Sequence, residues 1–397
     1  MRAVRKIAFA LNLLMPTLIG VAVRAQEESN PAARRDAPTT AAAAEAPAAL
    51  DEVLEEVRKK HGVPALAAAV VREGQTIALG ATGVREARSG HRVSIDDRFH
   101  IGSCTKSMTA TLCAMLVEGG TLRWDSKVGE VLADLKDSIN PSFREVTLEQ
   151  LLCHRSGLPD DHAPDLVVYP KLLALDGEIM AQRRKMVQIV MDRPPAHEVG
   201  TKFAYSNNGF AIAGAMCEAA AKESYESLLR RMLFKPLDMK TAGFGAPGSA
   251  KTVDQPRGHT SLLGWYLTAT PGPTADNPPV YAPAGTVHCS IGDWAKYAAL
   301  HLDAARGKPR LLKAETFTRL HGDPYKQEYG FGWAVIEADW SEGKVLAHDG
   351  TNRRWYAVIV IAPDEDLALL TATNAGSDAA AKACVDARKA IRAPFLK

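Results

Sequence analysis

The chain begins with an apolar run at positions 7–23, behind the basic residues Arg2, Arg5 and Lys6. The tripeptide at 23–25 suits a signal peptidase, so residues 1–25 are predicted to be a cleaved signal peptide, with a retained membrane anchor as the alternative. Residues 26–49 are rich in Ala and Pro and lack large apolar side chains, which predicts a linker. The folded domain is therefore expected at residues 50–397, in a protein exported to the periplasm or secreted.

The hydrophobic pattern changes from residue 50 onward. Four apolar residues recur there at helical spacing: Leu50, Val53, Leu54 and Val57. Gly62 follows at the expected end of this helix. Two β-like runs, 65–71 and 76–82, flank Glu73-Gly74 and predict a hairpin. Near the other end of the chain, four more strands are predicted at 331–336, 345–348, 355–361 and 367–373, and a final helix at 379–391.

The middle of the chain has helical periodicity. Helices are predicted at residues 106–118, 183–191, 208–221, 225–233 and 293–305, with Pro- and Gly-bearing loops between them. Strands thus lie near both ends of the domain and helices lie between them. The economical arrangement is one antiparallel sheet built from both ends, flanked by helices and carrying a helical insertion, which is an α/β fold of the α+β type.

Composition narrows the classes of function. Of the 397 residues, 46% are hydrophobic and 24% are charged, as in ordinary globular proteins. The net charge is only +2, so the sequence predicts no nucleic-acid partner. The chain has six cysteines and no C-x-x-C pair, so they define no disulfide framework. The expected partner is a small-molecule or peptide substrate, and no permanent membrane span is expected once the signal is cleaved.

A candidate nucleophile precedes the helix predicted from residue 106. Ser103-Cys104-Thr105-Lys106 is an S-x-x-K motif, and residues three apart on a helix share one face, about 4.5 Å apart along the axis. A serine needs an adjacent base to act as a nucleophile, and a lysine serves where burial or neighbouring charge favours its neutral form. The motif alone is weak, because a chain of this length contains it on the order of once by chance, often as a capped helix with a surface lysine.

Two further motifs could complete a site. Tyr205-Ser206-Asn207 lies between a β-like pair, Phe203-Ala204, and a predicted helix; the tyrosine could relay a proton, or Asn207 could merely cap the helix. His348-Asp349-Gly350-Thr351 ends a predicted strand whose edge could bind an acyl-amide backbone, or His348 could be only a turn histidine.

Together and in this order, the three motifs resemble the active site of the β-lactamase-related serine hydrolases, which include class C β-lactamases, D-Ala-D-Ala carboxypeptidases and a group of esterases. Other stretches resemble the same family: residues 151–159 its LLxHxSGLP loop, 233–239 its F-x-PLGM turn with Asp238 in place of glycine, 283–285, and 329–333. The resemblance covers about residues 50 to 390. It implies a β-lactamase/transpeptidase-like fold and acyl transfer through a serine ester, with no metal and no cofactor.

The resemblance also implies roles for individual residues. Ser103 would be the acylated nucleophile, Lys106 its base and Tyr205 the proton relay. Asn207 would contact the substrate or Lys106.

The third motif would supply the rest of the site. His348 and Gly350 would form its third wall, and the backbone N–H groups of Ser103 and Thr351 would form the oxyanion hole.

One departure from the family bears on the substrate. His348 stands where β-lactamases of this type usually carry lysine, and histidine is largely neutral near pH 7. This favours a peptidase or esterase; a true β-lactamase, or a penicillin-binding module without turnover, is the alternative. Arg353 and Arg354 could bind a substrate carboxylate instead, or they could be a solvated pair on a strand.

Three other features are set aside. Residues 243–248 spell G-x-G-x-x-G, but Pro247 interrupts the motif and no strand–turn–helix surrounds it. His154 and His162 flank an acidic loop, yet loop histidines are usually not metal ligands. Cys104 lies beside Ser103 and is expected in the core, as are Cys113, Cys217 and Cys384.

Overall fold

The computed structural model describes residues 50–160, 165–272 and 274–395. The predicted signal peptide (1–25) and linker (26–49) lie outside the described residues. An antiparallel seven-stranded sheet dominates the fold, in the order β2-β1-β12-β11-β10-β9-β8. Its strands are β1 (Ala65–Arg72), β2 (Gln75–Gly83), β8 (Tyr329–Gly330), β9 (Trp333–Glu337), β10 (Lys344–Thr351), β11 (Tyr356–Ala362) and β12 (Leu367–Thr373).

The sheet joins the two ends of the described chain, as predicted. β1 pairs with β12 in the register Leu66↔Thr373 to Arg72↔Leu367, so residues some 300 positions apart lie side by side. The predicted hairpin is also present, since β1 and β2 are linked through Glu73 and Gly74, both with positive φ. The sheet from both ends, flanked by helices, confirms the predicted α+β fold.

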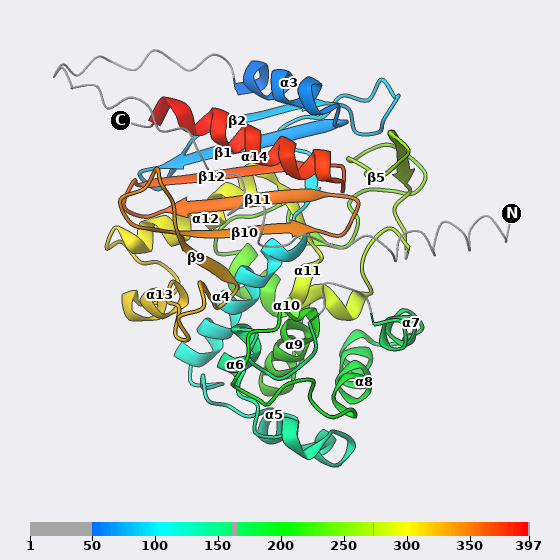
Figure 1. Cartoon of the computed structure of the whole chain (residues 1–397), viewed down its shortest axis with the longest axis vertical. Coiled ribbons are helices and arrows are strands. Elements are labelled where there is room, and N and C mark those ends of the chain that lie inside the picture. Colours follow the sequence, from blue (N-terminus) through cyan, green and yellow to red (C-terminus); the bar gives the residue numbers. More distant parts are fainter. Residues whose placement is uncertain (1–49, 161–164, 273, 396–397) are drawn as a thin grey trace, which may run out of the picture.

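Both faces of the sheet are buried. Along β1, Ala65, Ala67, Ala69 and Val71 contribute to one apolar cluster, and Leu66, Ala68 and Val70 to the other. Helices α3 (Leu50–His61) and α14 (Asp378–Arg392) cover the second cluster, and α12 (Ile291–Ala305) covers the first (Figure 1). Burial on two sides explains why these strands are continuous apolar runs in the sequence.

The middle of the chain forms a largely helical region below the sheet in the view of Figure 1. Its helices are α4 (Thr105–Glu118), α5 (Val128–Val131), α6 (Leu148–Leu152), α7 (Val168–Leu173), α8 (Ile179–Met191), α9 (Asn207–Ala221), α10 (Tyr225–Leu229) and α11 (Ala282–Gly285), with α13 (Ala314–Leu320) nearer β9. All seven predicted helices and all six predicted strands are recovered within a few residues. Short 3₁₀ turns are η1 (Gly102–Cys104), η2 (Ala133–Ser138), η3 (Pro141–Phe143), η5 (Pro279–Tyr281) and η6 (Ala393–Phe395), and η4 (Arg230–Phe234) is a π-helical turn.

The middle region also contains strands that the sequence did not predict. β3 (Arg98–His100), β7 (Val287–Ser290) and β4 (Gly243–Phe244) form a three-stranded sheet, and β5 (Gly258–Leu262) pairs with β6 (Trp265–Ala269). These segments are too short for a periodic pattern to emerge. Among the residues placed by the structure, no helix is long and apolar enough to cross a membrane.

Candidate active site

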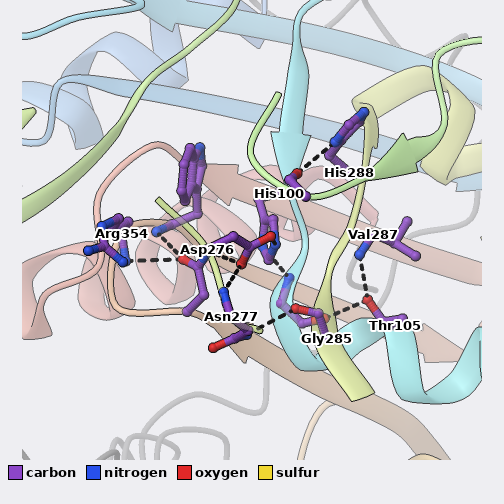
Figure 2. Close-up of polar contacts among 12 residues, drawn as sticks. His100, Thr105, Asp276, Asn277, Gly285, Val287, His288 and Arg354 are labelled. Carbon is purple, nitrogen blue, oxygen red and sulfur yellow. Dashed lines mark hydrogen bonds and ion pairs between the residues drawn. The ribbon is translucent and has the colours of Figure 1, made fainter. Parts of the chain in front are cut away.

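Ser103 lies in the tight turn η1 that leads into α4, and Gly102 enters this turn with φ +51°. His100 holds the turn, because its Nδ1 accepts from the Gly102 N–H at 3.1 Å while its Nε2 lies 2.8 Å from Oδ2 of Asp276 (Figure 2). The Thr105 hydroxyl donates to the Gly102 carbonyl at 2.7 Å. The backbone that carries Ser103 is thus held by side chains that come before and after it in the sequence, His100 and Thr105.

Lys106 is fully buried one turn beyond Ser103. Its Nζ donates to Ser103 Oγ at 3.0 Å, to Asn207 Oδ1 at 2.7 Å and to the Ala284 carbonyl at 2.7 Å. Asn207 and Ala284 thus accept from two N–H groups of the amine, and the amine faces Ser103 Oγ at the same time. The S-x-x-K motif therefore points its lysine at its serine and away from bulk water.

Tyr205 lies on the other side of the lysine. Lys106 Nζ is 4.8 Å from the centroid of the Tyr205 ring, and the ring is buried. The preceding pair Phe203-Ala204 is not a strand, contrary to the sequence interpretation; Ala204 donates its N–H to the His154 carbonyl at 2.9 Å instead. The alternative that Asn207 only caps α9 is also wrong: Ser206 caps the helix by accepting from the Gly209 N–H, and the Asn207 side chain reaches Lys106.

The third motif lies on β10, beside η1. β9 pairs with β10 from Lys344 to Ala347, so the remaining part of β10 faces the turn that carries Ser103. A Cβ added at Gly350 would lie 2.1 Å from the Ile101 carbonyl oxygen and 2.6 Å from Ser103 N. A Cβ added at Gly102 would lie 2.4 Å from Thr351 N. Only glycine permits this approach, which brings the N–H groups of Ser103 and Thr351 to one small region.

His348 is a buried residue within β10, so the interpretation as a turn histidine is wrong. Burial, and next the positive charge of Lys106, lower the pKa of His348 to about 3. Its Nε2 lies 3.4 Å from the Tyr329 hydroxyl, and its Nδ1 contacts the Asp349 carbonyl. The third wall of the site is therefore neutral at physiological pH.

Arg353 and Arg354 lie in the turn between β10 and β11 and are half-buried, so the alternative of a solvated pair on a strand is wrong. Burial lowers the pKa of both guanidinium groups. Asn352 holds the turn: its Nδ2 donates to Asp276 Oδ1 at 2.7 Å, and its Oδ1 accepts from the Arg354 N–H at 3.2 Å. Asp276 thus links the turn of the arginines to His100 and so to the Ser103 turn.

The cysteines set aside in the sequence are core residues, as expected. Cys104 is fully buried and its pKa is raised well above the usual value by burial. Cys113, Cys217 and Cys384 are also buried core residues with free thiols. No cluster of potential metal ligands occurs among residues 50–160, 165–272 and 274–395, and His162 lies outside these ranges.

Sequence reasoning missed several contacts of the site. Lys106 binds the Ala284 carbonyl, and His348 lies within hydrogen-bond distance of the Tyr329 hydroxyl. The Asp276 carboxylate contacts His100 before the Ser103 turn, and the His154 side chain contacts the backbone next to Tyr205. Ala284, His154 and Tyr329 lie in stretches that resemble the family. A resemblance marks such positions, but it does not show which atoms they bring together.

The family model for Beta-lactamase matches residues 50–392 of the chain. A similar curated relative is "Penicillin-binding protein 4" of Amycolatopsis lactamdurans, 29% identical over 337 residues, which cover 82% of this chain and 84% of the relative. "Protein flp" of Staphylococcus aureus (strain N315) is 22% identical over 339 residues, which cover 83% of this chain but only 63% of that protein.

Solved structures resemble the fold at low identity. The octameric penicillin-binding protein homologue from Pyrococcus abyssi matches with a TM-score of 0.70 at 20% identity, over 87% of this chain and 76% of that chain. D-alanine carboxypeptidase AmpC from Burkholderia cenocepacia matches with a TM-score of 0.67 at 19% identity, over 87% and 97% of the two chains. These matches support the predicted β-lactamase/transpeptidase-like fold.

Proposed function

The chain belongs to the Beta-lactamase family, and from this membership and its site geometry we propose that it is an exported serine hydrolase that forms an acyl-enzyme on Ser103. The observation that carries the proposal is the contact of Lys106 Nζ with Ser103 Oγ at 3.0 Å, in a buried position where Asn207 and Ala284 orient the amine. Such a pair of nucleophile and adjacent amine is what serine acylation requires.

In the proposed reaction, the Ser103 oxygen attacks the carbonyl carbon of an amide or ester. Lys106, in its neutral form, accepts the serine proton, and Tyr205 relays a proton to the leaving amine or alcohol. The N–H groups of Ser103 and Thr351 stabilise the oxyanion, since the contacts of Gly102 and Gly350 bring these two backbone segments together. Water then hydrolyses the serine ester and restores Ser103.

The neutral third wall bears on the substrate. Because His348 stays uncharged at physiological pH, it supplies no fixed cation for the carboxylate of a penicillin. We propose as the substrate either a small ester, which needs no such cation, or a D-Ala-D-Ala-type peptide, whose terminal carboxylate another cation must bind. The half-buried arginines of the β10–β11 turn are the proposed contact for a substrate carboxylate.

The test of the proposed function combines labelling with turnover. The protein, Ser103→Ala and the surface control Ser142→Ala are incubated with a fluorophosphonate and with a fluorescent penicillin, and labelled peptides are mapped. We expect label on Ser103 in the protein and the control, none in Ser103→Ala, and turnover of D-Ala-D-Ala peptides or short-chain esters. Rapid cephalosporin hydrolysis would identify a β-lactamase, and stable labelling without any turnover a penicillin-binding module. Absence of label on Ser103 overturns the proposal.

The carboxylate contact has its own test. Arg353→Ala and Arg354→Ala are compared on a pair of esters that differ only in a carboxylate. We expect one of the two variants to raise KM for the charged ester alone. Unchanged selectivity in both variants would remove the arginines from the substrate site.

A further inference from the structure

His154, in the loop after α6, holds Tyr205 from two directions. Its carbonyl accepts from the Ala204 N–H at 2.9 Å and its Nδ1 accepts from the Ser206 N–H at 3.0 Å, so the residues on either side of Tyr205 bind the same histidine. The His154 ring also packs on the Tyr205 ring, with 4.4 Å between centroids. His154 therefore determines both the backbone position and the ring plane of the tyrosine.

The same histidine is connected to the third motif. His154 Nε2 lies 3.2 Å from the Tyr329 hydroxyl, and this hydroxyl lies 3.4 Å from His348 Nε2. His348 Nδ1 in turn contacts the Asp349 carbonyl. A line of buried side chains thus runs from the Tyr205 segment to β10.

The hydrogen bonds at the two ends of this line determine which atom donates in each contact between them. Because His154 Nδ1 accepts from an N–H group, it carries no proton, so His154 is neutral and its proton is on Nε2, which donates to Tyr329. Because a carbonyl can only accept, His348 Nδ1 carries the proton of that ring. The lone pair of neutral His348 Nε2 then accepts from the Tyr329 hydroxyl. All hydrogen bonds point in one direction, toward β10.

We propose that His154 and Tyr329 are positioning residues that fix Tyr205 and His348 relative to each other, and that they do so through this directed hydrogen-bond relay. The inference rests on the proposed function, since Tyr205 and His348 belong to its site. The relay also limits where the proton carried by Tyr205 can go. The only basic lone pair of His348 is occupied by Tyr329, so the proton relayed by Tyr205 passes between Lys106 and the leaving group rather than to His348.

Aromatic packing and hydrogen bonds around His154 and Tyr329 hold the relay in position. His154 has φ +57° and is buried, with Phe203 and Phe210 packed at centroid distances of 5.5 and 5.2 Å. Gln327 ties the two segments together, since its Nε2 donates to the Cys153 carbonyl at 2.8 Å and its Oε1 accepts from Arg155 Nε at 2.7 Å. The loop of His154 and the segment of Tyr329 are thus fastened to each other next to the relay.

The kinetic test uses Tyr329→Phe, His154→Asn and the double variant. Asparagine tolerates positive φ and keeps an acceptor near the Ser206 N–H, but it is too short to reach Tyr329. Tyr297→Phe, which removes another buried hydroxyl, bonded to Thr111, is the matched control. Acylation of Ser103 is measured in single turnovers with an activated ester.

We expect each single variant to slow acylation about tenfold or more with little change in substrate affinity, because misplaced groups lower the rate rather than binding. The double variant should be no slower than the slower single variant, and the control should be unchanged. Multiplied losses in the double variant, or acylation at the original rate in Tyr329→Phe, would overturn the relay.

A second measurement is independent of the reaction. Imidazole ¹⁵N spectra of the resting protein should show His154 protonated only on Nε2 and His348 only on Nδ1 near pH 7, and Tyr329→Phe should shift the Nε2 signal of His348. A proton on His154 Nδ1, or a charged ring, excludes the relay. If wild-type Ser103 is never acylated, the proposed function fails and these spectra alone decide the relay.

Discussion

Lys106 Nζ and Asn207 Oδ1 lie 2.7 Å apart and join the first turns of two helices, α4 and α9, that are a hundred residues apart in the sequence. The contact directs the amine toward Ser103 and leaves it beside the Tyr205 ring. The Asn207 side chain is therefore not available to cap α9, and Ser206 caps the helix instead by accepting from the Gly209 N–H.

Replacing this amide tests its role. In Asn207→Asp a carboxylate would favour the charged ammonium, which cannot accept the serine proton, so we expect acylation to fall about a hundredfold or more. Asn207→Ala should lose less, because only orientation is removed. Asn140→Asp, where aspartate can still cap the turn η3, controls for added charge. Equal acylation rates in Asn207→Asp and the native protein would contradict this account.

The close approach of β10 to the Ser103 turn predicts the effect of Gly350→Ala. The added Cβ would meet backbone atoms of Ile101, Ser103 and Cys104 at 2.1 to 2.9 Å, so the strand or the turn must shift. We expect acylation to fall about a hundredfold, since the oxyanion donors separate. Gly90→Ala is the control, because a Cβ there meets nothing within 4 Å. Unchanged labelling of Gly350→Ala by a fluorophosphonate would show that Thr351 does not contribute to the oxyanion hole.

Cys104 provides a test of the nucleophile. It is adjacent to Ser103, but its sulfur is buried against the His348 carbonyl at 3.4 Å, and burial keeps it a neutral thiol. Cys104→Ala should therefore keep fluorophosphonate labelling on Ser103, with a loss of stability of about 1 kcal/mol from the missing sulfur. Iodoacetamide should leave the native thiol unmodified in the folded protein. Loss of acylation together with retained folding would point to the thiol instead.

Buried neutral histidines predict a loss of stability in mild acid. Burial lowers the pKa of His288 to about 4, so between pH 6.5 and 4 the unfolded chain binds a proton that the folded chain does not. The contribution of His288 to stability is therefore complete above pH 6.5 and falls as the pH decreases, by about 2 kcal/mol at pH 5.

The comparison with His288→Asn isolates this contribution. Asparagine can still donate to the Gly245 carbonyl, which His288 Nδ1 contacts at 2.8 Å, but it does not titrate. The comparison is needed because burial raises the pKa of Glu218 to about 7, and that group titrates with the opposite sign in the same window. Urea unfolding at pH 7 and pH 5 should show a smaller decrease for the variant. Equal decreases in both proteins would mean that His288 is protonated in the folded state.

The sequence by itself determined the local elements and the three motifs. Apolar periods and the turn at Glu73-Gly74 predicted the strands of the main sheet and most long helices, because helices and hairpins depend on residues only a few positions apart. The order of S-x-x-K, Y-x-N and H-x-G, together with the resemblance, predicted the family and the residues that converge around Ser103.

Only the tertiary structure decided how these motifs are connected. Three sets of contacts join segments far apart in the chain. The Ala284 carbonyl binds Lys106, and Asp276 links His100 to Asn352. Tyr329 links His154 to His348. Neither composition nor period encodes such contacts, because they depend on how packed elements orient individual side chains. For the same reason, the neutral state of His348 follows from its burial beside Lys106 and not from its position in the motif.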